Sequence, residues 1–132
     1  MFYISDDKKK LQFDKVMNLL GQTYWAQNRT EDQVKTSIEH SVCFGVYSKE
    51  TDEQIAFSRV ITDYSTTYYI CDVIVDEKHR GNGIGKAMIN AITTDERFSN
   101  VFGMLITRDA HGLYSQYGFE VDPEHYMKRS GK

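Results

Sequence analysis

The chain has 132 residues, of which 40% are hydrophobic and 27% charged, and 16 Lys and Arg against 19 Asp and Glu give a net charge of −3. A chain of this length usually forms one core, and no Gly/Ser-rich or charged linker divides it, so we expect a single domain over residues 1–132. The mild acidity argues against nucleic acid or an anionic membrane surface as a partner.

Nothing in the sequence suggests a membrane or an oxidising compartment. The longest apolar run, Tyr68 to Val75, contains Asp72 and is shorter than the roughly 18 to 20 residues that span a bilayer. The N-terminus lacks the apolar core of a signal peptide, so the cytoplasm is the default location. Cys43 and Cys71 have no Cys or His partners at ligand spacing, which favours reduced core thiols and no metal site.

Two helices are predicted at the N-terminal end. Apolar residues recur at helical spacing from Phe13 to Tyr24, and this helix should end near Gly21 or continue to about Trp25. The segment from Thr30 to Gln33 has the form of a capping box, which predicts that a second helix begins there.

Strands follow, joined by turn-rich segments that indicate an antiparallel meander. They are expected over Val42–Tyr47, Ile55–Thr62 and Tyr68–Val75. After a Gly-rich turn, a helix from Ile84 to about Phe98 leads to a strand at Val101–Thr107, which is nearly all apolar and therefore expected to be buried.

The C-terminal end is predicted to hold a short helix and one more strand. The helix should run from about Asp109 to Tyr117 and end at Gly118, and the strand should begin with Phe119 to Val121. The strands on either side of the Gly-rich turn and its helix form a crossover unit, so they should be parallel. The sequence therefore predicts an α/β (α+β) fold with a mixed, mostly antiparallel sheet.

The Gly-rich turn is the first candidate for chemistry. A strand that runs directly into a helix leaves backbone N–H groups unpaired at the positive helix terminus, which is what phosphate binding requires. Lys78, Arg80 and Lys86 add positive charge. The turn fits neither the dinucleotide-binding fingerprint nor the P-loop, and a turn that merely joins strand to helix is the alternative. The charge favours a pyrophosphate ligand, held by Arg80, Gly81, Asn82, Gly83, Ile84, Gly85 and Lys86.

The segments Val73 to Val75, Arg80 to Gly85 and Ala110 to Phe119 form two motifs that resemble those of the GNAT superfamily of N-acetyltransferases. Val73 to Val75 and Arg80 to Gly85 reproduce its Val-x-Val strand and its [Arg/Gln]-x-x-Gly-x-[Gly/Ala] loop. Ala110 to Phe119 reproduces the pattern Ala-x-x-Leu-Tyr-x-x-x-Gly-Phe, and the order of elements matches along the whole chain. Two positions depart from the family pattern, with Glu77 in place of Pro and Thr107 in place of Asn.

The resemblance implies a GNAT-like twisted sheet flanked by helices, with the parallel pair of strands around the cofactor. It also implies transfer of an acetyl group from acetyl-CoA to a primary amine of a small molecule or peptide, by direct attack on the thioester. Main-chain amides near Val73 and Val75 would hold the pantetheine arm. Tyr114 would be the general acid, and packing is its alternative role.

The remaining candidate residues are the base and the acceptor site. Asp72 is the only carboxylate inside the third predicted strand, so it acts as a base, directly or through water, attracts a cationic substrate, or pairs with Arg59 or a backbone group. The family uses the first two helices as the substrate wall, which implies contacts from Tyr24, Trp25 and Arg29, although such aromatic residues also complete cores. Arg29 would suit an acceptor with a carboxylate.

One alternative function keeps the fold without the chemistry. In it the chain is a catalytically inactive CoA-binding, sensing or partner-binding module. The sequence also leaves open whether the protein forms a homodimer.

Overall fold

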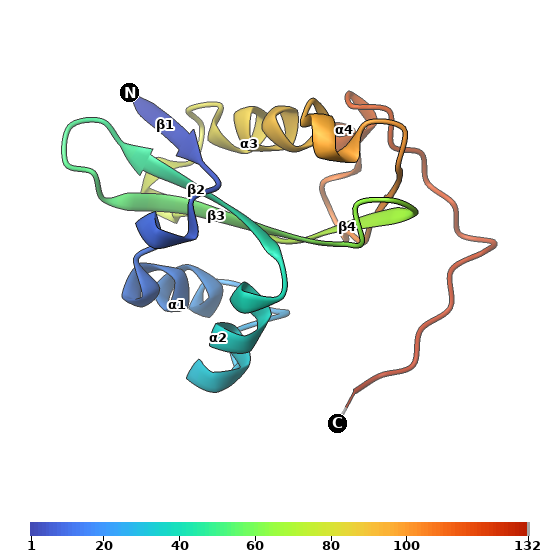
Figure 1. The fold of residues 1–132 in the computed structure, drawn as a ribbon, viewed down its shortest axis with the longest axis horizontal. Coiled ribbons are helices and arrows are strands. Elements are labelled where there is room, and N and C mark those ends of the chain that lie inside the picture. The colour runs from blue at the N-terminus through green and yellow to red at the C-terminus, as the bar shows by residue number, and fades with distance from the viewer. Residues whose placement is uncertain (132) are drawn as a thin grey trace.

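A five-stranded sheet forms the centre of the molecule (Figure 1). The computed structural model describes residues 1–131. The strands lie in the order β1-β2-β3-β4-β5, and all neighbours are antiparallel except the parallel pair β4 and β5. The mixed α/β class, the meander and the parallel crossover pair are thus confirmed, whereas β1 was not predicted. The strands are β1 (Phe2–Ser5), β2 (Val42–Ser48), β3 (Gln54–Thr62), β4 (Thr67–Val75) and β5 (Phe102–Leu105).

Helices cover both faces of the sheet, as Figure 1 shows. One face carries α1 (Phe13–Gly21) and α2 (Glu31–Glu39), and the other carries α3 (Ile84–Thr93) and α4 (His111–Ser115). The predicted end of the first helix at Gly21 is confirmed. The capping box is also confirmed, because Thr30 Oγ1 accepts from the Gln33 backbone while the Gln33 side chain accepts from the Thr30 N–H.

Two apolar cores hold these layers together. Ile84, Met88, Ile89 and Ile92 of α3 are buried against the sheet on one side. Residues of α1 and α2 fill the core on the other side, with Val16, Leu19, Leu20 and Val34 buried. Complete burial of one such side chain stabilises the fold by about 1.5–3 kcal/mol, so both layers are fixed firmly to the sheet that carries the site.

Three predictions near the C-terminal end are wrong. The strand expected to be buried, β5, is one of the two edge strands of the sheet. Phe102 and Met104 of β5 and Ile106 just after it expose 68%, 37% and 55% of their surface. The preceding helix ends at Thr93, where the Thr94 hydroxyl donates to the Asn90 carbonyl, and a separate 3₁₀ turn follows.

The third error is the final strand expected from Phe119. Residues 119–131 form no helix or strand and run away from the sheet, drawn in red in Figure 1. The ring of Phe119 packs edge-on against Tyr114, with their centroids 6.1 Å apart, instead of joining the strand order. This contact places Phe119 beside α4.

An irregularity in β4 determines which face each of its side chains occupies. Asp72 has a positive φ of 56°, and the register of β4 against β3 shifts between Phe57 and Arg59. Before this bulge, Ile70 lies in the core on the α3 side, and after it Ile74 lies in the core on the α1 side. The bulge therefore directs Asp72 toward the connection between α1 and α2.

Candidate active site

The gap between β4 and β5 is the centre of the site. The two strands pair from Thr67 to Ile70 of β4 and from Phe102 to Leu105 of β5. Among the described residues, the second half of β4, from Cys71 to Val75, has no partner on that side. Backbone groups that face away from β3 there are not paired with β5 and can contact a ligand, apart from the Val75 carbonyl, which accepts from Arg80. This fits the expected role of the segment around Val73 and Val75.

The glycine loop opens the N-terminus of α3 toward solvent. Gly81 and Gly83 have positive φ angles of 85° and 77°, a conformation that other residues rarely adopt. Gly83 is the N-cap residue and supplies no side-chain cap, so the N–H groups of the first turn face outward unpaired. A Cβ atom at Gly81 or Gly83 would meet no atom within 4 Å. Space and donors for an anion are therefore both present.

Side chains of the loop divide between structural roles and free charge. Arg80 Nε donates to the Val75 carbonyl at 3.2 Å, and Asn82 Nδ2 donates to the His79 carbonyl at 3.0 Å. Lys78 and Lys86 are exposed. The Asn82 side chain thus shapes the loop, whereas the two lysines are available to a negatively charged ligand.

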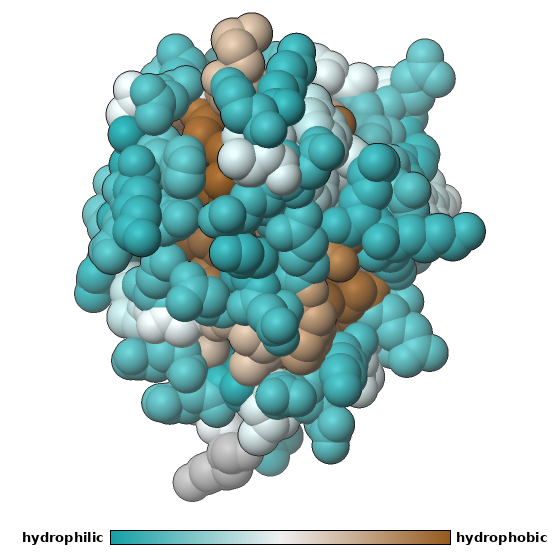
Figure 2. All heavy atoms as spheres, turned by 90° about the vertical axis from the view of Figure 1, so that its left-hand side faces the viewer, coloured by the Kyte–Doolittle hydropathy of each residue, from teal (hydrophilic) through white to brown (hydrophobic). Residues whose placement is uncertain are grey.

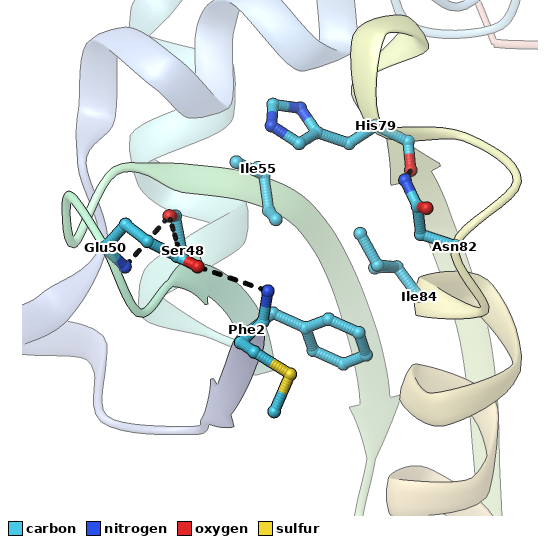
Figure 3. Close-up of a pocket in the computed structure, with 8 residues that line it drawn as sticks. Phe2, Ser48, Glu50, Ile55, His79, Asn82 and Ile84 are labelled. Carbon is cyan, nitrogen blue, oxygen red and sulfur yellow. Dashed lines mark hydrogen bonds and ion pairs between the residues drawn. The ribbon is translucent and has the colours of Figure 1, made fainter.

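A shallow pocket adjoins the loop (Figure 3). His79, Asn82 and Ile84 form one wall, and residues of β1, β3 and the end of β2 form the other. The face that includes the β2–β3 turn is mainly hydrophilic, with smaller apolar areas between the polar side chains (Figure 2). The pocket shows that there is room beside the start of α3.

Asp72 is the centre of a buried polar cluster. Its Oδ1 accepts from Trp25 Nε1 at 3.2 Å, and its Oδ2 accepts from Arg29 Nη1 at 2.6 Å and from Arg59 Nε at 2.8 Å. Arg59 also donates to Ser41 Oγ. Burial alone would raise the pKa of Asp72, but hydrogen bonds and charge from the two arginines outweigh it and lower the pKa.

The hydrogen bonds of Asp72 make it poorly suited to the role of general base that the sequence suggested. Both of its oxygens are occupied, and its lowered pKa makes it a weak proton acceptor. The pairing with Arg59 that the sequence left open is present in the structure. The cluster joins the α1–α2 connection to the centre of the sheet.

The residues expected at the acceptor site lie together in this connection. The rings of Tyr24 and Trp25 pack edge to face, with their centroids 5.0 Å apart. Trp25 and Arg29 both donate hydrogen bonds to Asp72. A residue that the sequence did not single out joins them, since the Arg108 guanidinium lies 4.0 Å from the centre of the Tyr24 ring. Arg108 follows β5, and nothing in the sequence distinguishes it from an ordinary surface arginine. Only its position after the fourth predicted strand could have identified it as a site residue.

Tyr114 lies on α4, on the opposite face of the sheet from α1 and α2. It is 8% exposed, and burial, with a smaller contribution from Asp109, raises the pKa of its hydroxyl to about 12. Thr107, which stands at the departure from the family pattern, accepts from the Ala110 N–H at 3.0 Å. Its hydroxyl thus supports the start of α4, which carries Tyr114.

Two kinds of feature are absent from residues 1–131. No group of three or more His, Cys, Asp or Glu is arranged there to hold a metal ion. No helix in that range is long and apolar enough to cross a membrane.

Comparisons with known proteins identify the family to which this fold belongs. Residues 39–121 match the family model described as an acetyltransferase (GNAT) domain, so the chain belongs to the GNAT family. A crystal structure from Xanthomonas campestris pv. campestris, described as an acetyltransferase of that family, is 36% identical, with a TM-score of 0.92 over 99% of this chain and 94% of that one.

One relative of lower identity and one structure with the same fold are also similar to the chain. A Gibberella zeae protein named as an acetyltransferase is 28% identical over 69% of this chain. The match covers 62% of the length of that protein. An acetyltransferase from Clostridium acetobutylicum, solved with acetyl-CoA, is 14% identical and shares the fold, with a TM-score of 0.68 over 98% of this chain and 95% of that one.

Proposed function

We propose that the protein is an N-acetyltransferase that transfers the acetyl group of acetyl-CoA to a primary amine of a small molecule or peptide. The observation that carries this proposal is the gap beside β4, with the open N-terminus of α3 at one end and Tyr114 on α4. We also propose that residues 1–132 act as one domain in the cytoplasm, since the free thiols Cys43 and Cys71 suit a reducing compartment.

The residues present fit acetyl-CoA. Outward N–H groups and exposed lysines at the start of α3 suit the pyrophosphate, through Arg80 to Lys86. The half of β4 that has no β5 partner, including Val73 and the N–H of Val75, offers main-chain groups for the pantetheine arm. When bound, acetyl-CoA supplies the activated acyl group, and the protein supplies position and hydrogen bonds.

Tyr114 is proposed as the proton donor. Attack by the amine on the thioester carbon breaks the bond to sulfur, which leaves with negative charge. A phenol whose pKa is raised to about 12 stays protonated near neutral pH and can donate to that sulfur. The alternative function is a module that binds CoA without catalysis. It is not favoured, because the chain belongs to an acetyltransferase family and Tyr114 is protonated, as a proton donor must be.

We propose that the acceptor ammonium loses its proton to water before attack, because only the neutral amine is a nucleophile. Asp72 is engaged by Arg29 and Arg59, and its pKa is lowered, so we assign it a positioning role. In this role it orients the α1–α2 connection and does not touch the reacting atoms.

Calorimetry with acetyl-CoA tests the proposed cofactor site. We expect binding in the micromolar range, and Gly83→Glu should weaken it at least about tenfold, because it strains a left-handed position and adds negative charge where phosphate binds. Gly21→Glu is the control, since it adds the same charge at an exposed helix end with no atom within 4 Å of its Cβ. Equal affinity of Gly83→Glu and the unchanged protein would contradict the site.

The pH dependence of kcat/KM tests the proton path. We expect kcat/KM to rise with pH up to the pKa of the acceptor amine, because the neutral fraction of the amine increases. The pKa of Tyr114, about 12, places loss of its proton above this range, so no decline is expected below about pH 10.

Two acceptors with different amine pKa values distinguish this path from a protein base. The break in the profile should move with the acceptor. A break that stays at one pH for both acceptors would instead reveal a titrating base in the protein.

A further inference from the structure

The buried cluster around Asp72 contains more positive than negative charge. Side chains of Arg29, Arg59 and Asp72 are 29%, 10% and 1% exposed. Within the described chain, no second carboxylate lies within 4 Å of either guanidinium. Two cations therefore share one anion in a place where uncompensated charge is costly. An anionic ligand would relieve this imbalance.

Arg29 is the member of the cluster that a ligand can reach. Arg59 is more deeply buried and donates to both Asp72 and Ser41. Arg29 uses one nitrogen, Nη1, for Asp72, and its side chain keeps 29% of its surface exposed. A guanidinium presents five donors in a planar fork that matches a carboxylate, so Arg29 retains donors for a second anion.

Arg108 adds a second cation to the same region. It is exposed, and no carboxylate lies within 4 Å of it in the part of the chain that the structure describes. Its guanidinium stacks on Tyr24, whose neighbour Trp25 hydrogen-bonds Asp72. Arg108 comes from beyond β5 and Arg29 from the α1–α2 connection, so two separate elements bring positive charge to the side chains around Tyr24, Trp25 and Asp72.

We infer that the acceptor is a small amine that also carries a carboxylate, as amino acids do, and that Arg29 and Arg108 bind this carboxylate. The inference rests on the proposed function and specifies its acceptor. Asp72 is the positioning residue, because it holds Arg29 at the sheet while leaving part of the guanidinium free. A cationic polyamine would meet uncompensated positive charge at the same place.

Matched ligand pairs test the inference. Each amino acid in a diverse panel is compared with its carboxamide as acceptor, by thiol release from acetyl-CoA. The N-acetyl forms of both are compared by calorimetry on the protein–CoA complex. We expect at least one pair in which the carboxylate form has about 10- to 100-fold higher kcat/KM and affinity. The amine of a carboxamide is less basic and more often neutral, so this preference would run against amine reactivity.

Variants connect the preference to the arginines. Arg29→Gln and Arg108→Gln should each reduce the preference, and Gln at position 29 keeps a donor for Asp72. Lys49→Gln removes an exposed cation of the β2–β3 turn and should leave the preference unchanged.

Several results would overturn the inference. These are equal binding and turnover of carboxylate and carboxamide forms across the panel, and a preference that neither arginine variant alters. Weaker acetyl-CoA binding by Arg108→Gln, with the acceptor preference intact, would assign Arg108 to the cofactor and overturn its part. Failure of the proposed function differs from all of these, because then acetyl-CoA itself would neither bind nor release thiol with any amine.

Discussion

Replacing Tyr114 with Phe is expected to lower kcat about 10²- to 10⁴-fold while acetyl-CoA affinity stays within about twofold. The change removes one oxygen from a side chain that is 8% exposed and packs against Phe119, so the ring contacts of α4 remain. The sulfur would then leave without its hydrogen-bond donor. Steady-state kinetics with any amine that supports turnover, together with calorimetry, measures both quantities.

Tyr117→Phe is the matched control for this variant. Tyr117 follows α4 closely, and its hydroxyl donates to the Lys86 carbonyl at 3.3 Å, so the same atom is removed beside the cofactor loop. We expect kcat to remain within about threefold, since one exposed neutral hydrogen bond contributes only about 0.5–1.5 kcal/mol. Normal turnover by Tyr114→Phe would contradict the proton donor assignment.

Features that depend on neighbouring residues were predictable from the sequence. The capping box at Thr30 and the positive φ at Gly83 follow from side chains and backbone rules within a few positions. The glycine loop could therefore be located with its helix and its adjoining strand. The class of the sheet followed from the same local patterns, because the crossover from β4 to β5 has a defined geometry.

Features that depend on pairing across the fold were not predictable. The bulge that gives Asp72 a positive φ has no glycine to mark it, yet it decides which face the carboxylate occupies. Arg108 acquires its position only when the end of β5 meets Tyr24. The apolar run at Phe102 to Ile106 looks buried in the sequence, but nothing local reveals that its strand lies at the edge of the sheet.

Replacing Asp72 with Ala is expected to lower the free energy of unfolding at pH 7 by about 3–5 kcal/mol. It leaves Arg29 and Arg59 without their shared anion, removes the acceptor of Trp25 Nε1, and puts Ala at a left-handed φ. The pKa of Asp72 is lowered in the folded state, so its contribution is fully present above its ordinary pKa near 4 and is lost only as pH falls through the lowered value. Urea denaturation gives the change directly.

A double-mutant cycle and an isosteric variant separate structure from chemistry at this position. Adding Arg59→Met to Asp72→Ala should cost less than the sum of the two single changes, because the buried cation left unpaired by Asp72→Ala is then removed as well. Asp72→Asn keeps an acceptor oxygen and tolerates the positive φ, so it should be less destabilising than Ala, with kcat reduced in proportion to any loss of folded protein. If Asp72→Asn were as stable as the unchanged protein and kept its KM for the acceptor, but had a kcat more than about 100-fold lower, Asp72 would act as the base, since a residue that only positions Arg29 would alter KM as well.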